Sequence, residues 1–213
     1  MKLKTPAISK ALLTTKDFQA ILDDEDYMLG DCEISQSDFS NETLDRAHLH
    51  NAVIKNSTFI HTNFSGIDIV DVRFINCDFS NADLSKASIH RVEFENCKLL
   101  GINFPESSLG NVLFSNSILN FATFHSSKLE KIIFQRCSLE SADFYDCALK
   151  NVVFDNCNLN EAAFEQTPLK GIDLSLSHFS SLRVSQNELK GCTVSREQAV
   201  YLSTLMGLKI TDG

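Results

Sequence analysis

Large apolar residues occupy every fifth position of the chain from Leu29 to Val194, which makes 34 consecutive positions without a break. An α-helix repeats its buried positions every 3.6 residues and a β-strand every 2, so neither element explains a period of five. Fourteen of the 16 phenylalanines fall on this phase, and only Phe18 and Phe121 do not. A repeat of this length predicts one structural unit used throughout residues 29–194.

A second period of twenty residues lies above the first. On the apolar phase, residues twenty apart form two opposite phenylalanine columns and two leucine columns. The columns are Phe74, Phe94, Phe114, Phe134 and Phe154; Phe64, Phe104, Phe124, Phe144 and Phe164; Leu99, Leu119, Leu139 and Leu159; and Leu109, Leu129, Leu149 and Leu169. The two periods together predict a coil in which five residues make one side and four sides make one turn.

Such a coil has a simple physical basis. Successive turns stack through backbone hydrogen bonds about 4.8 Å apart, so some eight turns make a rod roughly 40 Å long. The large apolar residue points to the axis, where each Phe or Leu contributes roughly 1.5–3 kcal/mol on burial. The residue two positions earlier also points inward near a corner. It is usually small or β-branched, and the main exceptions are Glu42, Leu182 and Asn187. The fold class predicted is an all-β solenoid with a C-terminal helix.

The seven cysteines all occupy this narrow corner position. They are Cys32, Cys77, Cys97, Cys137, Cys147, Cys157 and Cys192. The chain has no C-x-x-C pair and no Cys/His group with the spacing of zinc ligands. We therefore expect each cysteine to be a small buried apolar filler.

The two ends depart from the repeat. Residues 1–28 are predicted to form an N-terminal cap, in which Thr14 or Thr15 begins a short helix that runs through Leu22 and is followed by an acidic, solvated turn. Residues 195–213 are predicted to form a C-terminal helix and tail, because Ser195 and Gln198 match a capping box and Gly207 is a typical stop. The apolar residues of this segment can cap the last coil, as the end of a solenoid requires. They are Ala199, Leu202, Leu205, Met206, Leu208 and Ile210.

Composition narrows the range of functions. The chain has 28 acidic and 19 basic residues and a net charge of −9, which disfavours direct binding to nucleic acid or to an anionic membrane and suits a partner with a basic surface. No apolar run approaches the ~18 residues of a membrane span, and the N-terminus lacks the features of a secretory signal, so a cytoplasmic protein is expected. The six histidines fall on outward positions, and no Gly-rich phosphate loop is present. A convex rod also offers few concave sites for a pair of catalytic carboxylates, so no enzyme, metal or cofactor is expected.

Two segments resemble the A(D/N)LXX unit of the pentapeptide-repeat family: Ala82-Asp83-Leu84-Ser85-Lys86 and Ala142-Asp143-Phe144-Tyr145-Asp146. The resemblance covers residues 29–194 and implies a right-handed quadrilateral β-helix. Length and the C-terminal tail are similar to those of the Qnr-type quinolone-resistance proteins. That similarity implies a homodimer, with the apolar residues of the C-terminal segment as a dimer interface in addition to a cap. It also implies that the dimer imitates DNA and binds DNA gyrase or topoisomerase IV. Many Qnr members carry two loops that interrupt the repeat, whereas the phase here never slips, as in the loop-free mycobacterial relative.

Candidate contact residues lie on the surface of the rod. Acidic residues at matching positions of different turns could form stripes that a topoisomerase contacts: Glu95 with Asp155, Glu106 with Asp146, and Asp83 with Asp143. The average net charge of the rod is about one per 5 Å, whereas duplex DNA carries one per ~1.7 Å. The rod could therefore imitate DNA only through local stripes of acidic residues. Leu113, Ile133 and Val153 form an outward apolar column that either contacts a partner or improves packing between strands.

Two functions from different classes follow. The leading hypothesis is a non-enzymatic, DNA-mimicking protein that inhibits type II topoisomerases or protects them from fluoroquinolones. The alternative is a pentapeptide-repeat scaffold for another protein partner, with the acidic residues serving solubility.

Overall fold

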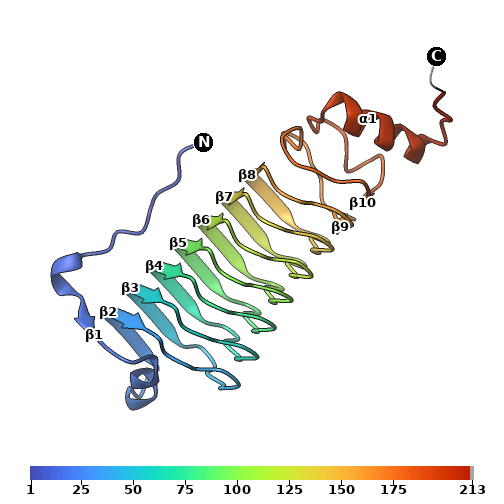
Figure 1. Cartoon of the computed structure of the whole chain (residues 1–213). Coiled ribbons are helices and arrows are strands. Elements are labelled where there is room, and N and C mark those ends of the chain that lie inside the picture. Colours follow the sequence, from blue (N-terminus) through green and yellow to red (C-terminus); the bar gives the residue numbers. More distant parts are fainter. Residues whose placement is uncertain (212–213) are drawn as a thin grey trace.

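The protein, described here by a computed structural model for residues 1–211, is a right-handed quadrilateral β-helix of about eight turns (Figure 1). The stacked strands make the body of the rod, and the single α-helix α1 (Arg196–Ser203) lies at its C-terminal end. The predicted fold class is confirmed. The last two residues of the predicted C-terminal segment, 212–213, lie outside the described residues.

One parallel sheet of eight strands runs along the rod in the order β1 to β8. Its seven long strands are β2 (Met28–Ser35), β3 (His48–Lys55), β4 (Asp68–Ile75), β5 (Ser88–Glu95), β6 (Ser108–Ser115), β7 (Lys128–Gln135) and β8 (Ala148–Asp155). Each strand pairs with the next in a register of twenty residues, as in Leu109 opposite Leu129. The other two sides of each turn stack through single parallel bridges such as Asp83 to Asn103. Both observations confirm the twenty-residue turn.

The corners of the coil are formed by residues with left-handed backbone conformation. Each of these residues lies two positions after a large apolar residue. Twenty-six non-glycine residues at this position have positive φ, from Asp31 to Gln166, and ten of them are asparagine. Asparagine tolerates this conformation better than most residues, because its side chain can hydrogen-bond locally. Even Phe121, off the apolar phase and 60% exposed, stands at a corner with φ of 58°. The corner conformation is therefore set by the coil and accepts almost any side chain.

The phenylalanine columns fill the interior. Within one column the rings stack in parallel, with 5.0 Å between the ring centroids of Phe94 and Phe114 and an interplanar angle of 7°. Across the interior the rings of the two columns meet edge to face, as Phe124 does with Phe134 at 6.0 Å. Offset stacking and edge-to-face contact are the arrangements that aromatic rings prefer. The core is thus one continuous column of apolar side chains.

Hydroxyl and thiol groups at the narrow corner position connect the turns inside the rod. The backbone N–H of Ala87 donates to Ser107 Oγ at 2.9 Å, and that hydroxyl in turn donates to the carbonyl of Leu84 at 2.9 Å. The thiol of Cys97 lies in the same kind of position, 3.6 Å from the carbonyl oxygen of Phe74. Six of the seven cysteines are buried and Cys192 is partly buried. The cysteines are therefore weak hydrogen-bond donors to the backbone as well as fillers.

The N-terminal end is closed by a phenylalanine outside the repeat. A short 3₁₀ helix η1 (Lys10–Leu12) leads to strand β1 (Thr14–Thr15), which pairs with β2, and then to the 3₁₀ helix η2 (Phe18–Asp23). The predicted helix cap at Thr14 or Thr15 is wrong: both threonines are in a strand, and Asp17 caps η2 by accepting from Gln19 N–H. Phe18 is buried, with its ring centroid 4.8 Å from those of Phe39 and Phe59, and it covers the first turn.

The C-terminal end is less regular than the repeat predicts. In earlier turns, the residue at the start of each strand donates its N–H to the turn before, as Ala148 does to the carbonyl of Ser127 at 2.9 Å. Pro168 occupies this position in the next turn and has no N–H, which explains why the long sheet ends at β8. Only the two-residue strands β9 (Ala162–Ala163) and β10 (Leu182–Arg183) follow, before α1 and the 3₁₀ helix η3 (Thr204–Met206).

Gln198 joins α1 to the last coil. The predicted capping box is confirmed: Ser195 Oγ accepts from Gln198 N–H, and Gln198 Oε1 accepts from Ser195 N–H. The buried amide nitrogen of Gln198 also donates to the carbonyls of Leu174 and Ser177, at 2.9 and 2.7 Å. The same side chain therefore begins the helix and satisfies two backbone groups of the coil.

The hydroxyl ladder yields a stability prediction. Ser107→Ala removes a buried hydroxyl that both accepts and donates a hydrogen bond, and we expect it to lower the free energy of unfolding by about 1–3 kcal/mol. Ser108→Ala, an exposed neighbour, should change it by less than about 0.5 kcal/mol. Chemical denaturation followed by circular dichroism measures both. Equal stabilities of the two variants would contradict a structural role for the ladder.

Candidate functional site

Two of the cysteine thiols are poorly reactive because they are largely buried. Burial raises the pKa of the Cys147 thiol to about 12 and that of Cys192 to about 11, so neither is a ready nucleophile at neutral pH. Within residues 1–211, no group of three or more His, Cys, Asp or Glu side chains is placed to hold a metal ion. In the same part of the chain, no helix has both the length and the apolar character needed to cross a bilayer.

The acidic residues expected to form stripes do not lie together. Each predicted pair occupies one column, but its members are two or three turns apart, or about 10–15 Å. Asp83 and Asp143 are half-buried, and each accepts a hydrogen bond from the backbone N–H two residues later, at 2.9 Å. These two carboxylates shape local turns.

The other four predicted acids differ in their surroundings. The Arg73 guanidinium lies 3.3 Å from Glu95, and Gln135 Nε2 donates to Asp155 at 3.0 Å. Glu106 and Asp146 are exposed at corners. Only these last two present their carboxylates fully to solvent.

A denser group of acids contains Asp143 and Asp146, which the sequence analysis named, and three further acids that it missed: Glu140, Glu161 and Glu165. Residues 137–147 and 157–168 form the two sides of consecutive turns that lie away from β7 and β8, and they contain no Lys or Arg. They carry five acidic residues, which we name the acidic face: Glu140, Asp143, Asp146, Glu161 and Glu165. Five charges over two turns, about 10 Å, amount to about one per 2 Å, close to the one per ~1.7 Å of duplex DNA. This group becomes apparent only when the charged residues on each side of the coil are counted separately.

The strand face of the rod, formed by β2 to β8, differs because its charges are mostly paired. Arg91 binds Asp71 with two hydrogen bonds of 2.6 Å, which hold the pKa of that carboxyl below its usual range. Lys55 pairs with Glu33 at 2.6 Å and Lys150 with Glu130 at 2.8 Å. Ion pairs near the surface contribute little to stability, but they balance most of the charge on the strand face, whereas the acidic face holds acids alone among its charged residues.

The apolar column lies on the strand face, partly under the chain's own N-terminal segment. Leu113, Ile133 and Val153 are opposite one another on β6, β7 and β8, and each is half-buried. Residues 1–6 and the first two of these side chains line a common hollow of about 360 Å³. The expectation of a freely exposed column therefore needs correction for Leu113 and Ile133, while Val153 lies outside the hollow.

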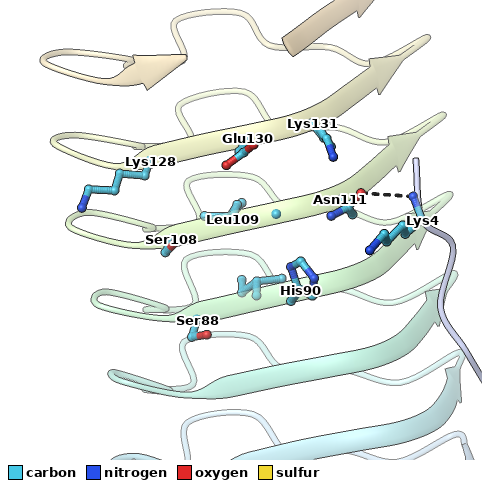
Figure 2. Close-up of a pocket in the computed structure, with 11 residues that line it drawn as sticks. Lys4, Ser88, His90, Ser108, Leu109, Asn111, Lys128, Glu130 and Lys131 are labelled. Carbon is cyan, nitrogen blue, oxygen red and sulfur yellow. Dashed lines mark hydrogen bonds between the residues drawn. The ribbon is translucent and has the colours of Figure 1, made fainter. Parts of the chain in front are cut away.

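Three backbone hydrogen bonds hold the N-terminal segment, residues 1–9, against the corners of the coil. The N–H groups of Lys4, Ala7 and Ser9 donate to the side-chain Oδ1 atoms of three corner residues, at 3.1, 2.8 and 2.8 Å. The acceptors are Asn111, Asp71 and Asn51. Figure 2 shows the segment crossing the strand ends and the bond from Lys4 to Asn111. At about 1 kcal/mol each, these bonds are weak against the entropy of ordering nine residues, so this segment opens before the rod does.

A basic hollow of about 460 Å³ lies beside this segment (Figure 2). Its floor is Gly110, where a Cβ would come within 2.7 Å of the His90 ring, and Lys4, Lys128 and Lys131 line its rim. Burial, and then the neighbouring charge of Arg91, lower the pKa of His90, so its ring is neutral at pH 7. The one carboxylate at the rim, that of Glu130, is paired with Lys150. Lys4 and Lys131 lie at one end of the hollow, whereas the Lys128 side chain points away from it at the other end (Figure 2), so the end beside Lys4 suits an anionic group.

The C-terminal end presents an apolar surface. Of the six predicted interface residues, Leu202 packs on the core, whereas Ala199 is exposed. Leu205, Met206, Leu208 and Ile210 are 37%, 62%, 54% and 49% exposed. Ala199, Leu202 and Met206 also line a hollow of about 450 Å³ with residues of the last coil. The segment therefore both caps the coil and leaves apolar side chains uncovered.

Comparison with known proteins decides the family. Family models match most of the repeat: "Pentapeptide repeat region" over residues 67–144 and 87–164, and "Pentapeptide repeats (8 copies)" over residues 32–69. The chain belongs to the pentapeptide-repeat family. No curated protein sequence matches it significantly.

Solved structures of the same family support the fold. Two trypsin-treated variants of QnrB1, a plasmid-mediated fluoroquinolone resistance protein, are similar to this pentapeptide-repeat chain. One is 20% identical with a TM-score of 0.50, and the match covers 84% of this chain and all of that chain. The other is 22% identical with a TM-score of 0.51, covering 87% of this chain and 92% of that chain. At these identities the likeness establishes the pentapeptide-repeat fold.

The contribution of the corner hydrogen bonds to the attachment of the N-terminal segment to this pentapeptide-repeat rod can be measured. Asn111→Gly removes the acceptor for Lys4 N–H and keeps a residue suited to the left-handed corner. We expect amide hydrogen exchange to speed up severalfold in residues 3–9 with the rod unchanged. Asn151→Gly, at the same corner of a turn that the segment does not contact, is the matched control. Identical exchange in both variants would show that the contact does not hold the segment.

Proposed function

We propose that this chain is a non-enzymatic protein that imitates DNA and binds type II topoisomerases, DNA gyrase or topoisomerase IV. The observation that supports the proposal most is the acidic face, where five acids lie on two consecutive turns, within stretches that themselves contain no Lys or Arg. The likeness in fold to QnrB1, whose description is that of a fluoroquinolone resistance protein, points to the same class of partner.

The physical argument rests on rigidity and charge. A groove that binds DNA is lined by Lys and Arg, and its affinity comes largely from neutralising closely spaced phosphates. Carboxylates on a solenoid are held at fixed spacing by the backbone, so they meet such a groove without the loss of freedom that a disordered acidic tail would suffer. The net charge of −9 steers the rod toward a basic surface before contact.

The proposal includes a homodimer formed through the C-terminal ends. Leu205, Met206, Leu208 and Ile210 lie beyond the last coil, and association of two copies through them would place the rods end to end. The resulting particle would present two acidic faces about a two-fold axis, which suits an enzyme that is itself two-fold symmetric.

Supercoiling assays test the function. Purified protein added to DNA gyrase or topoisomerase IV should reduce activity in a dose-dependent way, because the rod competes with DNA for the groove. Recovery of activity when a fluoroquinolone is also present would add drug protection to the proposal. No effect on either enzyme at concentrations well above that of the enzyme would overturn it.

Neutralising the acidic face tests which surface makes the contact. We expect Glu140→Gln, Asp146→Asn, Glu161→Gln and Glu165→Gln together to raise the Kd for the topoisomerase at least tenfold and to flatten its salt dependence, because four closely spaced charges are lost. The matched control removes four charges from the strand face: Glu33→Gln, Glu93→Gln, Glu95→Gln and Glu130→Gln. Equal weakening by both sets would mean that net charge alone matters.

The dimer is tested by a single charge. Met206→Glu places a carboxylate at the centre of the exposed apolar segment and should shift the protein from dimer to monomer in light scattering. Leu176→Glu, at a residue 66% exposed on the side of the rod, should leave the dimer intact. A monomeric parent protein, or a dimer that persists in the Met206 variant, would contradict this interface.

A further inference from the structure

The corner acceptors of the strand face match the spacing of an extended backbone. The acceptors Asn111 and Asp71 lie two turns apart, which is about 10 Å along the rod. Their donors, the N–H groups of Lys4 and Ala7, are three residues apart, which is also about 10 Å in an extended chain. From Asp71 to Asn51 is one turn, about 5 Å, and Ala7 and Ser9 are two residues apart. The repeat of the coil therefore sets out acceptors at intervals that an extended chain meets with its own N–H groups.

These contacts do not depend on the sequence of the segment that makes them. All three donors are backbone groups, and the apolar hollow beside them is lined by Leu3 and Pro6 from the segment and by Leu113 and Ile133 from the sheet. Another extended chain with apolar side chains at similar positions can make the same contacts.

The surface also continues beyond the N-terminal segment. Asn151 repeats the corner position of Asn111 two turns further on, and Val153 repeats the apolar position of Leu113. Neither of these two residues lines a hollow with residues 1–6. A longer extended chain would find further contacts on β8.

The charge around Lys4 indicates that residues 1–9 are a poor fit. Lys4 lines the same hollow as Lys128 and Lys131, and the one rim carboxylate, that of Glu130, is already paired. Lys4 and Lys131 lie at the same end of this hollow (Figure 2), and their like charges oppose one another, whereas an acidic side chain in place of Lys4 would be attracted to Lys131.

We propose that the strand face carries a groove that binds an extended segment of a partner protein. This segment is apolar and has an acidic side chain opposite the basic hollow. Residues 1–9 of the chain itself cover the groove and are displaced when the segment binds. The cover is attached to the rod and competes from a high effective concentration, so the groove is available only to a segment that binds better than the cover does. The groove lies on the strand face, separate from the acidic face, and is independent of topoisomerase binding.

The test measures peptide binding in the full chain. The probe is a fluorescent peptide with the sequence of residues 1–9. Lys4→Pro with Ala7→Pro removes two of the three donated N–H groups from the cover and leaves the groove unaltered. We expect this variant to bind the peptide at least tenfold more tightly than the parent protein does, measured by fluorescence anisotropy. A peptide carrying Lys4→Glu should bind the variant severalfold more tightly than the parent peptide.

Two further substitutions in the uncovered variant locate the binding. Adding Asn111→Gly should weaken the peptide at least tenfold, whereas Asn151→Gly, at the same corner outside the reach of the nine-residue peptide, should not change it. Equal peptide affinity in the parent and the Pro variant, or no loss with Asn111→Gly, would overturn the groove. A parent peptide that binds as well as its Lys4→Glu form would overturn the acidic preference. Because the assay contains no topoisomerase, its outcome is separate from that of the proposed function.

Discussion

The structure depends on one geometric constraint: each residue hydrogen-bonds through its backbone to the residue about one turn away, and a turn is twenty residues. This is possible because the backbone turns left-handed at the fifth position of each repeat from residue 31 to residue 171. A corner placed one residue earlier or later would turn the large apolar residues outward and break the columns. The phenylalanine stacks, the hydroxyl ladder and the fixed spacing of surface groups all follow from this regular corner.

The same constraint determines how the surface is organised. Residues twenty apart in the sequence lie above one another on the same side of the rod. Acidic and basic residues that alternate along the chain can therefore lie on different sides of it. Here the strand face holds paired charges and an apolar hollow, while two turns of the opposite sides carry acids alone. The rod offers two different contact surfaces, and the backbone holds the groups of each at fixed intervals of about 5 Å.

Most of the fold could be predicted because the repeat is local and redundant. The apolar phase and the twenty-residue columns predict the four-sided coil, and Ser195 and Gln198 predict the start of the C-terminal helix. What could not be predicted lies where the period stops. The cap at Asp17 and the path of residues 1–9 depend on contacts with distant corners such as Asn51 and Asn111, which no local pattern indicates. Pro168 marks the early end of the sheet. Its effect could be predicted only with the knowledge that the backbone N–H at this position of each turn donates a hydrogen bond to the turn before.

The candidate contact residues were harder to predict than the fold. Pairing acids by column identified Glu106 and Asp146 but also Asp83 and Asp143, which are used by local turns. The absence of Lys and Arg from residues 137–147 and 157–168 is a different signal, which led to the proposed acidic face. Leu113 and Ile133 were correctly placed in one column, but the N-terminal segment over them has no counterpart in the repeat.

A structure of the protein bound to DNA gyrase or topoisomerase IV, determined by cryo-electron microscopy, tests the central claim most directly. The account predicts that Glu140, Glu161 and Glu165 face the basic DNA-binding groove of the enzyme, with the strand face turned away from it. A complex in which the strand face fills that groove and the acidic face meets solvent would contradict it.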